Sequence, residues 1–244
     1  MALVHEFEQS GNWLFKRRGW LPLFIFIPSL AYIYFFPDPS LAFNRGLEAA
    51  FLGLSLSGQV IRAVTIGRTP RNTSGRNINK QVADRLNTTG IYSLVRHPLY
   101  LGNFFMWLGP VLFLRSLWIT IIFCLAYWLY YERIMFAEEQ FLRRKFGDDY
   151  DRWSERVRAF IPSFGNYKKS NLSFSFRNVL KREYNGFASI FIVFALLDIA
   201  RNYSLEGQAA IHSMWAVLLA FGLLVWLVLR ILKKHTSLLK VAGR

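Results

Sequence analysis

The feature that most constrains this chain is the arrangement of its apolar residues, which lie in long stretches with almost no charge. A helix needs about 17–25 such residues to cross a bilayer. Six stretches approach or reach this length: residues 19–36, 47–66, 99–114, 117–131, 186–200 and 211–232. Only Arg115 and Ser116 separate the third stretch from the fourth, which predicts a tight helical hairpin. We therefore predict an all-α membrane protein with about six transmembrane helices.

The positive charges predict how these helices are oriented. If both termini lie on one face, 27 of the 30 Lys and Arg residues lie there, Arg62 included, and only Arg45, Arg115 and Arg201 lie on the other face. The positive-inside rule then places both termini in the cytosol. The net charge of +15 is explained by this topology and by contact with anionic lipid. Because the charge is explained in this way, it is not evidence for nucleic-acid binding. The single cysteine, Cys124, cannot form an intrachain disulfide, which is consistent with an active site on the reducing, cytosolic side of the membrane.

Two cytosolic segments follow from this topology. Residues 67–97 are polar and contain no long apolar run, whereas apolar residues recur every three or four positions in residues 132–162. The second pattern predicts an amphipathic helix that is interrupted at Gly147. The chain is thereby divided into three parts. Residues 1–66 form an N-terminal two-span hairpin and residues 67–162 form the central core. Residues 163–244 form a basic interfacial connector followed by a C-terminal two-span hairpin.

Several common catalytic motifs are missing from the sequence. No two glycines are two positions apart, so there is no Gly-x-Gly of a dinucleotide fold, and there is no Gly-x-Ser-x-Gly. No pair of histidines has metal-ligand spacing with a further Cys or His. The four histidines are His5, His97, His212 and His235. We therefore predict no metal site and disfavour a hydrolase, an NTPase or a zinc enzyme.

The first informative segment lies where the cytosolic loop enters the third apolar stretch. Arg96 and His97 precede Pro98, and proline suits the first turn of a helix. Free backbone N–H groups and the positive end of the helix favour an anion at this point. In the alternative interpretation, Arg96 only extends to the lipid interface and His97 caps the helix.

The second informative segment follows the fourth apolar stretch. Glu138 and Glu139 are adjacent acids beside apolar residues, and Arg133 lies five residues before Glu138. Two acids in this position need partners if they lose solvent, and ribose hydroxyls or an ammonium would serve. In the alternative interpretation, the acids form a solvated patch that pairs with Arg143 or Arg144.

Together the two segments resemble the isoprenylcysteine carboxyl methyltransferases and the integral-membrane phospholipid methyltransferases. The family pattern consists of Gly-x-Tyr, Arg-His-Pro-x-Tyr-x-Gly, a helical hairpin, Glu-Glu, Phe-Gly, x-x-Tyr and a closing Pro. In this chain the pattern reads Gly90, Tyr92, Arg96-His97-Pro98, Tyr100, Gly102, Glu138-Glu139, Phe146-Gly147, Tyr150 and Pro162. The similarity covers residues 58–162.

The resemblance implies that S-adenosylmethionine binds on the cytosolic face, in a pocket closed by the cytosolic amphipathic helix and the loop that follows the Glu-Glu pair. It implies that Arg96 and Arg133 hold the acidic group of a lipid or lipidated substrate. The residues expected to contact the cofactor are Tyr92, His97, Pro98, Tyr100, Glu138, Glu139 and Leu142.

The nature of these residues favours one class of acceptor. A carboxylate or phosphate oxygen is already ionised near neutral pH and needs no general base, and arginines hold oxyanions by charge-assisted hydrogen bonds. An amine must first lose a proton, and paired arginines repel its ammonium form. We therefore favour O-methylation of an acidic headgroup over N-methylation of a phosphatidylethanolamine-type amine.

Two other classes remain open from the sequence. The membrane sterol reductases, which use NADPH, have a similar Arg-His-Pro-x-Tyr-x-Gly segment, but an aspartate follows it where this chain has Asn103. A membrane scaffold with a degenerate pocket is the other. The expected partners are a lipid substrate and the membrane, either the bacterial inner membrane or the endoplasmic reticulum. The sequence predicts no oligomeric state.

Overall fold

The computed structural model describes residues 2–19, 24, 26–70, 72–73, 81–241 and 243. These residues form helices and connecting turns, with no strand in the described part of the chain. The α-helices are α1 (Leu3–Arg17), α2 (Phe26–Phe35), α3 (Arg45–Gly67), α4 (Pro98–Phe113), α5 (Leu117–Phe146), α6 (Asp148–Ser154), α7 (Phe176–Glu206) and α8 (Ser213–His235). The all-α prediction is confirmed for this part of the chain.

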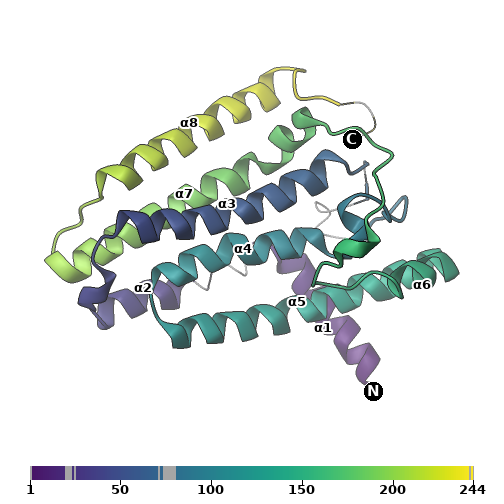
Figure 1. Cartoon of the computed structure of the whole chain (residues 1–244), viewed down its shortest axis with the longest axis horizontal. Coiled ribbons are helices and arrows are strands. Elements are labelled where there is room, and N and C mark those ends of the chain that lie inside the picture. The colour runs from purple at the N-terminus through teal and green to yellow at the C-terminus, as the bar shows by residue number, and fades with distance from the viewer. Residues whose placement is uncertain are drawn as a thin grey trace.

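Five long helices lie side by side in the order α8, α7, α3, α4 and α5 (Figure 1). The short helix α2 lies at one end of this layer, near the start of α3, and α1 crosses α5 at the other end (Figure 1). Both termini are found at the end that carries α6 (Figure 1). The bundle therefore has a site end, where α4 begins and α6 lies, and a far end, where α4 turns into α5.

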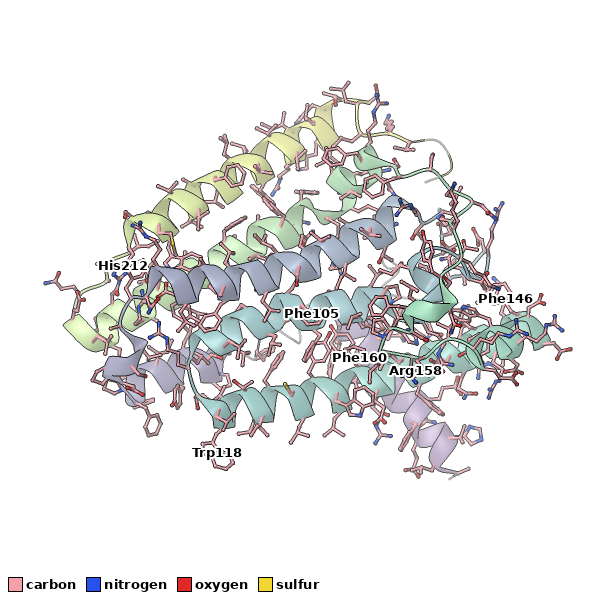
Figure 2. All side chains as sticks on the ribbon, in the orientation of Figure 1. Phe105, Trp118, Phe146, Arg158, Phe160 and His212 are labelled. Atoms are coloured by element: carbon pink, nitrogen blue, oxygen red, sulfur yellow. The ribbon has the colours of Figure 1, made fainter. Side chains whose placement is uncertain are left out.

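Four helices, α3, α5, α7 and α8, are long and apolar enough to cross a membrane, while α4 is apolar but has 16 residues. Their outward side chains are apolar and exposed. Trp118 at the start of α5 is 75% exposed and points away from the bundle (Figure 2). The chain is therefore a multi-pass membrane protein. The total of six spans stays a prediction, because residues 20–23 and 25 of the first lie outside the described residues.

Two helices extend well beyond the predicted spans. Helix α5 has 30 residues and continues without interruption from the fourth apolar stretch through the Glu-Glu pair to Phe146. The predicted interruption at Gly147 is confirmed, since this residue has φ +50° and separates α5 from α6. Helix α7 has 31 residues and extends beyond both ends of the predicted fifth span at residues 186–200. Asp198 and Arg201 lie inside α7 because they pair with each other and with the buried Glu48.

Small residues allow α3 and α4 to pack closely, as is common between helices in membranes. A Cβ atom added at Gly58 of α3 would lie 2.3 Å from the carbonyl oxygen of Gly102. A Cβ atom added at Gly109 of α4 would lie 2.4 Å from the carbonyl oxygen of Phe51. The backbones of the two helices are thus in direct contact along most of their length.

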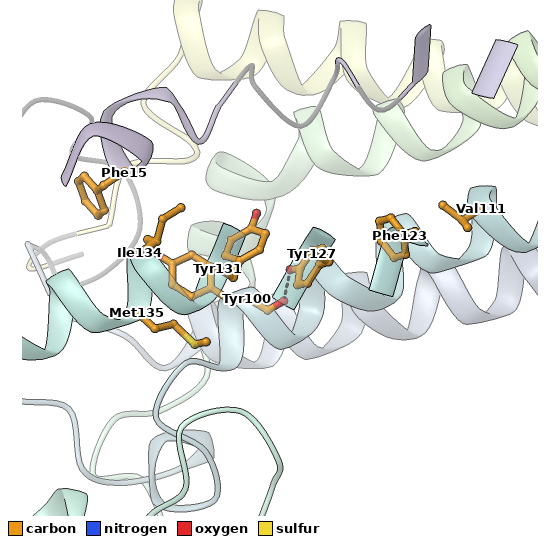
Figure 3. Packing of buried hydrophobic residues seen from close by; sticks show 8 residues of the cluster. All are labelled: Phe15, Tyr100, Val111, Phe123, Tyr127, Tyr131, Ile134 and Met135. Carbon is orange, nitrogen blue, oxygen red and sulfur yellow. Dashed lines mark hydrogen bonds between the residues drawn. The ribbon is translucent and has the colours of Figure 1, made fainter. Parts of the chain in front are cut away.

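An aromatic cluster joins α1, α4 and α5 beneath the site end (Figure 3). Tyr127 and Tyr131 of α5 stack with ring centroids 4.3 Å apart, and Tyr131 lies 4.7 Å from the ring of Tyr100 on α4. The Tyr127 hydroxyl donates a 2.6 Å hydrogen bond to the Tyr100 carbonyl, drawn as a dashed line in Figure 3. Phe15 of α1 belongs to the same cluster, so α1 is an integral part of the fold.

A buried polar cluster fastens the far end. Arg201 of α7 is 1% exposed and pairs with Glu48 of α3 and with Asp198, one turn earlier in α7. The indole of Trp215 on α8 donates a 2.6 Å hydrogen bond to the second Glu48 oxygen. His212, labelled at this end in Figure 2, contacts Asp198 at 3.0 Å. Arg115 lies 3.9 Å from Glu48, so two arginines face two carboxylates in this cluster, which explains how α7 continues through it.

Candidate active site

The segment that leads into α4 is held in place by a second stretch of backbone. Gly90 has φ +63°, which glycine adopts at little cost, and pairs with Lys168 in an isolated β-bridge. The N–H groups of Arg96 and His97 donate hydrogen bonds of 2.9 and 3.1 Å to the carbonyls of residues 158–159. The connector after α6 therefore fixes the backbone from which Arg96 and His97 project.

Pro98 takes the first position of α4, as predicted. His97 is the N-cap residue of α4, but its side chain makes no capping hydrogen bond. Its Nε2 atom lies 2.9 Å from a Glu139 oxygen, and its Nδ1 atom lies 3.5 Å from a Glu138 oxygen. Burial disfavours the charged imidazole, but the two carboxylates outweigh it and raise the pKa of His97 above its ordinary value.

Glu138 is the meeting point of three elements. The Tyr100 hydroxyl on α4 donates a 2.7 Å hydrogen bond to its Oε1 atom. Arg18, directly after α1, reaches the same oxygen at 3.1 Å and the Tyr100 hydroxyl at 3.0 Å. The Arg18 and Glu138 side chains are only 14% and 23% exposed. Sequence analysis did not select Arg18, which it assigned to the positive charges before the first span.

Glu139 pairs with the loop before α4. The Nε atom of Arg96 lies 3.1 Å from a Glu139 oxygen, and a second Arg96 nitrogen donates a 3.1 Å hydrogen bond to the Ser154 carbonyl in α6. Glu139 therefore connects α5 to the Arg-His-Pro segment, and Arg96 connects that segment to α6. The two motifs that are 42 residues apart in the sequence form one site.

The alternative interpretation of the acidic pair is wrong. Arg143 pairs with Asp151 at 2.8 Å, and Arg144 pairs with Glu8 of α1. Both arginines are more than half exposed, whereas the Glu-Glu pair faces the interior of the site.

A cavity of about 470 Å³ opens at this site. Eight of the nine predicted site residues line it, together with polar residues of the loop before α4, such as Gln81 and Asn87. The eight are Tyr92, Arg96, His97, Pro98, Tyr100, Glu138, Glu139 and Leu142.

The cavity continues between α4 and α7 as an apolar arm. Residues spaced three or four apart line it on both helices: Met106, Trp107 and Pro110 on α4, and Gly186, Ser189, Ile190 and Val193 on α7. The thirteen residues from Pro98 to Pro110 span about 18 Å along a helix. The cavity thus joins a charged chamber at the site end to an apolar space within the membrane-spanning part of the bundle.

An ion pair lies where the chamber meets this arm. Arg62 of α3 contacts Glu183 of α7 through two nitrogens, at 2.7 and 2.9 Å, and donates a 2.6 Å hydrogen bond to Asn103 of α4. Sequence analysis noted Arg62 only as an internal charge of a span and did not select Glu183. A charge inside an apolar stretch was the signal for such a site, because it needs a partner and often marks a functional position.

The described residues that line the cavity carry an excess of positive charge. Five arginines line it: Arg18, Arg62, Arg85, Arg96 and Arg182. Three glutamates line it: Glu138, Glu139 and Glu183. With His97 neutral, two positive charges are left over, and a protonated His97 adds a third. The cavity therefore favours a bound group with negative charge.

Arg133 is the one predicted site residue that the structure does not bring to the cavity. Its guanidinium lies 3.2 Å from the ring centroid of Phe7 in α1. A Cβ atom added at Gly11 of α1 would lie 2.1 Å from the Arg133 carbonyl oxygen, so α1 covers this face of α5. The reason is helix geometry: five residues turn a helix by about 140° past one full turn, so Arg133 and Glu138 point in different directions.

Comparison with known proteins gives a consistent picture. The family model for phospholipid methyltransferase matches residues 46–149. A protein-S-isoprenylcysteine O-methyltransferase of Schizosaccharomyces pombe is 33% identical over 117 residues, which cover 47% of this chain and 49% of the relative. The chain thus spans about half the length of this relative. No solved structure matches.

Two further relatives show the range of the similarity. The protein-S-isoprenylcysteine O-methyltransferase B of Arabidopsis thaliana is 31% identical over 137 residues, covering 54% of this chain and 67% of the relative. The cobalt-zinc-cadmium resistance protein CzcN of Cupriavidus metallidurans is 34% identical over 124 residues, covering 50% and 51%.

Proposed function

Because this chain belongs to the family of the isoprenylcysteine and phospholipid methyltransferases, we propose that it methylates an oxyanion of a lipid or lipidated substrate. The methyl donor would be S-adenosylmethionine, and the reaction would take place at the cytosolic membrane interface. One observation carries the proposal: a single cavity joins a charged chamber to an apolar arm. Such a cavity can hold a polar donor and a lipid acceptor together.

The chamber contains suitable groups for the donor. Glu138 and Glu139 are acceptors for ribose hydroxyls or an ammonium, and His97 and Tyr100 orient them by hydrogen bonds. Tyr92, Pro98 and Leu142 line the same chamber and supply nonpolar surface. When bound, the donor supplies a methyl group that its sulfonium charge has already activated. The protein's task is then to position the two reactants and exclude water.

The charge of the cavity favours an anionic acceptor. The described lining residues include five arginines and three glutamates, and the donor brings a further cation. A carboxylate or phosphate oxygen would complete this balance, with Arg96 as the acceptor-binding residue nearest the Glu-Glu pair. No general base is required, because the oxyanion is ionised near neutral pH. A protonated amine would add to the excess, so N-methylation is the weaker candidate.

The first test is calorimetric binding of S-adenosylhomocysteine to the detergent-purified protein. We expect micromolar affinity that falls at least tenfold in Glu138→Ala. The matched control is Glu132→Ala, on the same helix but outside the cavity lining. Binding of NADPH in place of S-adenosylhomocysteine would overturn the proposal in favour of a reductase.

The second test identifies the acceptor by transfer of a labelled methyl group. N-acetyl-S-farnesylcysteine offers a carboxylate, phosphatidic acid a phosphate, and phosphatidylethanolamine an amine. Labelling of either acid, with Arg96→Ala reducing the rate, would support O-methylation. Labelling of phosphatidylethanolamine alone would show that the acceptor class is wrong.

A further inference from the structure

The residue after α1 provides the cavity with a cation that the family comparison does not cover. Arg18 lines the cavity and lies well before residue 46, where the family match begins. Its guanidinium lies over the ring of Phe15, 3.8 Å from the centroid, and contacts Glu138 and Tyr100. Burial opposes its charge, but Tyr100 and Glu138 more than compensate and raise the pKa of Arg18. Arg18 is therefore a permanent charge inside the site.

The position of Arg18 is fixed by the packing of α1. Phe15 is 5% exposed and belongs to the aromatic cluster of Figure 3. Phe7 packs edge-on against Phe136 of α5, with ring centroids 5.7 Å apart. At Gly11 the α1 backbone comes so close to α5 that a Cβ atom would overlap the Arg133 carbonyl. Three turns of α1 are thus seated on α5, and they place Arg18 at the Glu138 carboxylate.

The carboxylate of Glu138 that contacts Arg18 is also the group proposed to bind the donor. Its Oε1 atom accepts from Arg18 and from the Tyr100 hydroxyl. In the proposed function the same carboxylate binds hydroxyl or ammonium groups of the donor. Once the donor engages it, the ion pair with Arg18 weakens, and the Arg18 guanidinium, which lines the same cavity and is 14% exposed, can contact a second anionic group there. The oxyanion of the acceptor is such a group.

We propose that Arg18 is a second acceptor-binding arginine, held by Glu138 until the donor binds and then paired with the oxyanion of the acceptor. This inference rests on the proposed function and replaces the role that the sequence suggested for Arg133. It predicts that donor and acceptor promote each other's binding, because each favours the arrangement in which Arg18 has left Glu138. Such coupling is reciprocal, and a factor of about five or more is typical.

The experiment measures binding of N-acetyl-S-farnesylcysteine with and without saturating S-adenosylhomocysteine. A parallel arm uses phosphatidic acid, which separates a carboxylate source from a phosphate source. The methyl ester of the first probe has no oxyanion and serves as the ligand control. For the wild type we expect S-adenosylhomocysteine to tighten binding of at least one acid about fivefold or more, and to leave the ester unchanged.

The variants assign this effect to Arg18. In Arg18→Gln we expect the tightening to disappear and the acceptor KM to rise more than kcat falls. S-adenosylhomocysteine should bind this variant as tightly as the wild type or more tightly, since Glu138 has lost a competitor. Arg17→Gln is the matched control, because Arg17 contacts Trp13 and does not line the cavity. Arg18→Lys retains the charge and should retain part of the tightening even if Arg18→Gln folds poorly.

The outcomes separate this inference from the proposed function. If the wild type binds S-adenosylhomocysteine and methylates an acid, but Arg18→Gln keeps the full tightening, the inference is overturned and the proposed function stands. Loss of S-adenosylhomocysteine affinity in Arg18→Gln would also overturn it, because a purely structural role would then explain the contact. Failure of the wild type to bind S-adenosylhomocysteine would overturn both.

Discussion

The close contact between α3 and α4 can be tested with a single added methyl group. In Gly58→Ala the new Cβ atom would lie 2.3 Å from the Gly102 carbonyl oxygen and 2.7 Å from the Met106 nitrogen. Both are backbone atoms, so no side-chain rotation relieves the overlap. Restoring ordinary contact requires α4 to move by about 1 Å, and overpacking of this kind costs about 1–3 kcal/mol. Alanine also returns about 0.5–1 kcal/mol because it is the better helix former.

Gly53→Ala provides the matched control. It lies in the same helix, and a Cβ atom there has no neighbour within 4 Å. We expect Gly53→Ala to stabilise the protein by about 0.5–1 kcal/mol, and Gly58→Ala to be about 1–3 kcal/mol less stable than that control. Thermal unfolding in detergent would show the difference as about 2–4 °C per kcal/mol. If Gly58→Ala melted at the same temperature as Gly53→Ala or above it, the direct backbone contact would be refuted.

Three further predictions concern the charged groups. Glu183→Gln leaves the Arg62 charge buried without its carboxylate and should cost about 3–5 kcal/mol, measured as a lower Tm. The pKa of His97 is raised in the folded protein, so its stabilising contribution is complete below pH 6.5 and is lost as the pH rises through the raised pKa. His97→Gln should therefore flatten the dependence of Tm on pH between pH 6.5 and the raised pKa. Arg133→Ala removes a cation–π contact and should cost about 0.5–1 kcal/mol. If it raised the acceptor KM as much as Arg96→Ala does, the substrate role suggested by the sequence would be restored.

Much of this architecture could be predicted because it depends on local pattern. Apolar runs identify the spanning helices, proline and glycine mark where α4 begins and α5 ends, and the two short motifs identify eight lining residues. The family suggested by those motifs is confirmed by the comparisons. These features require only information carried within a few turns of helix.

The remaining features depend on which residues meet across the bundle. The predicted fifth span ends at residue 200, directly before Arg201, whereas the buried pair of Arg201 with Asp198 allows α7 to continue. Arg18 and Glu183 were missed because their partners are more than a hundred residues away in the sequence. Arg133 was misplaced because its direction depends on helix rotation and on α1, which no motif marks.

The uninterrupted course of α5 makes the site sensitive to the thickness of the bilayer. A helix of 30 residues is a rod of about 45 Å, with apolar surface in its first half and the carboxylates of Glu138 and Glu139 in its second half. Helices adapt to thicker or thinner membranes by changing their tilt. If α5 pivots at its start, a change of about 10° moves Glu138, about 32 Å along the helix, by about 6 Å. Glu138 and Glu139 move with α5, whereas the backbone of Arg96 and His97 is hydrogen-bonded to residues 158–159. We therefore expect the thickness of the surrounding bilayer to affect the contacts between these two pairs of residues.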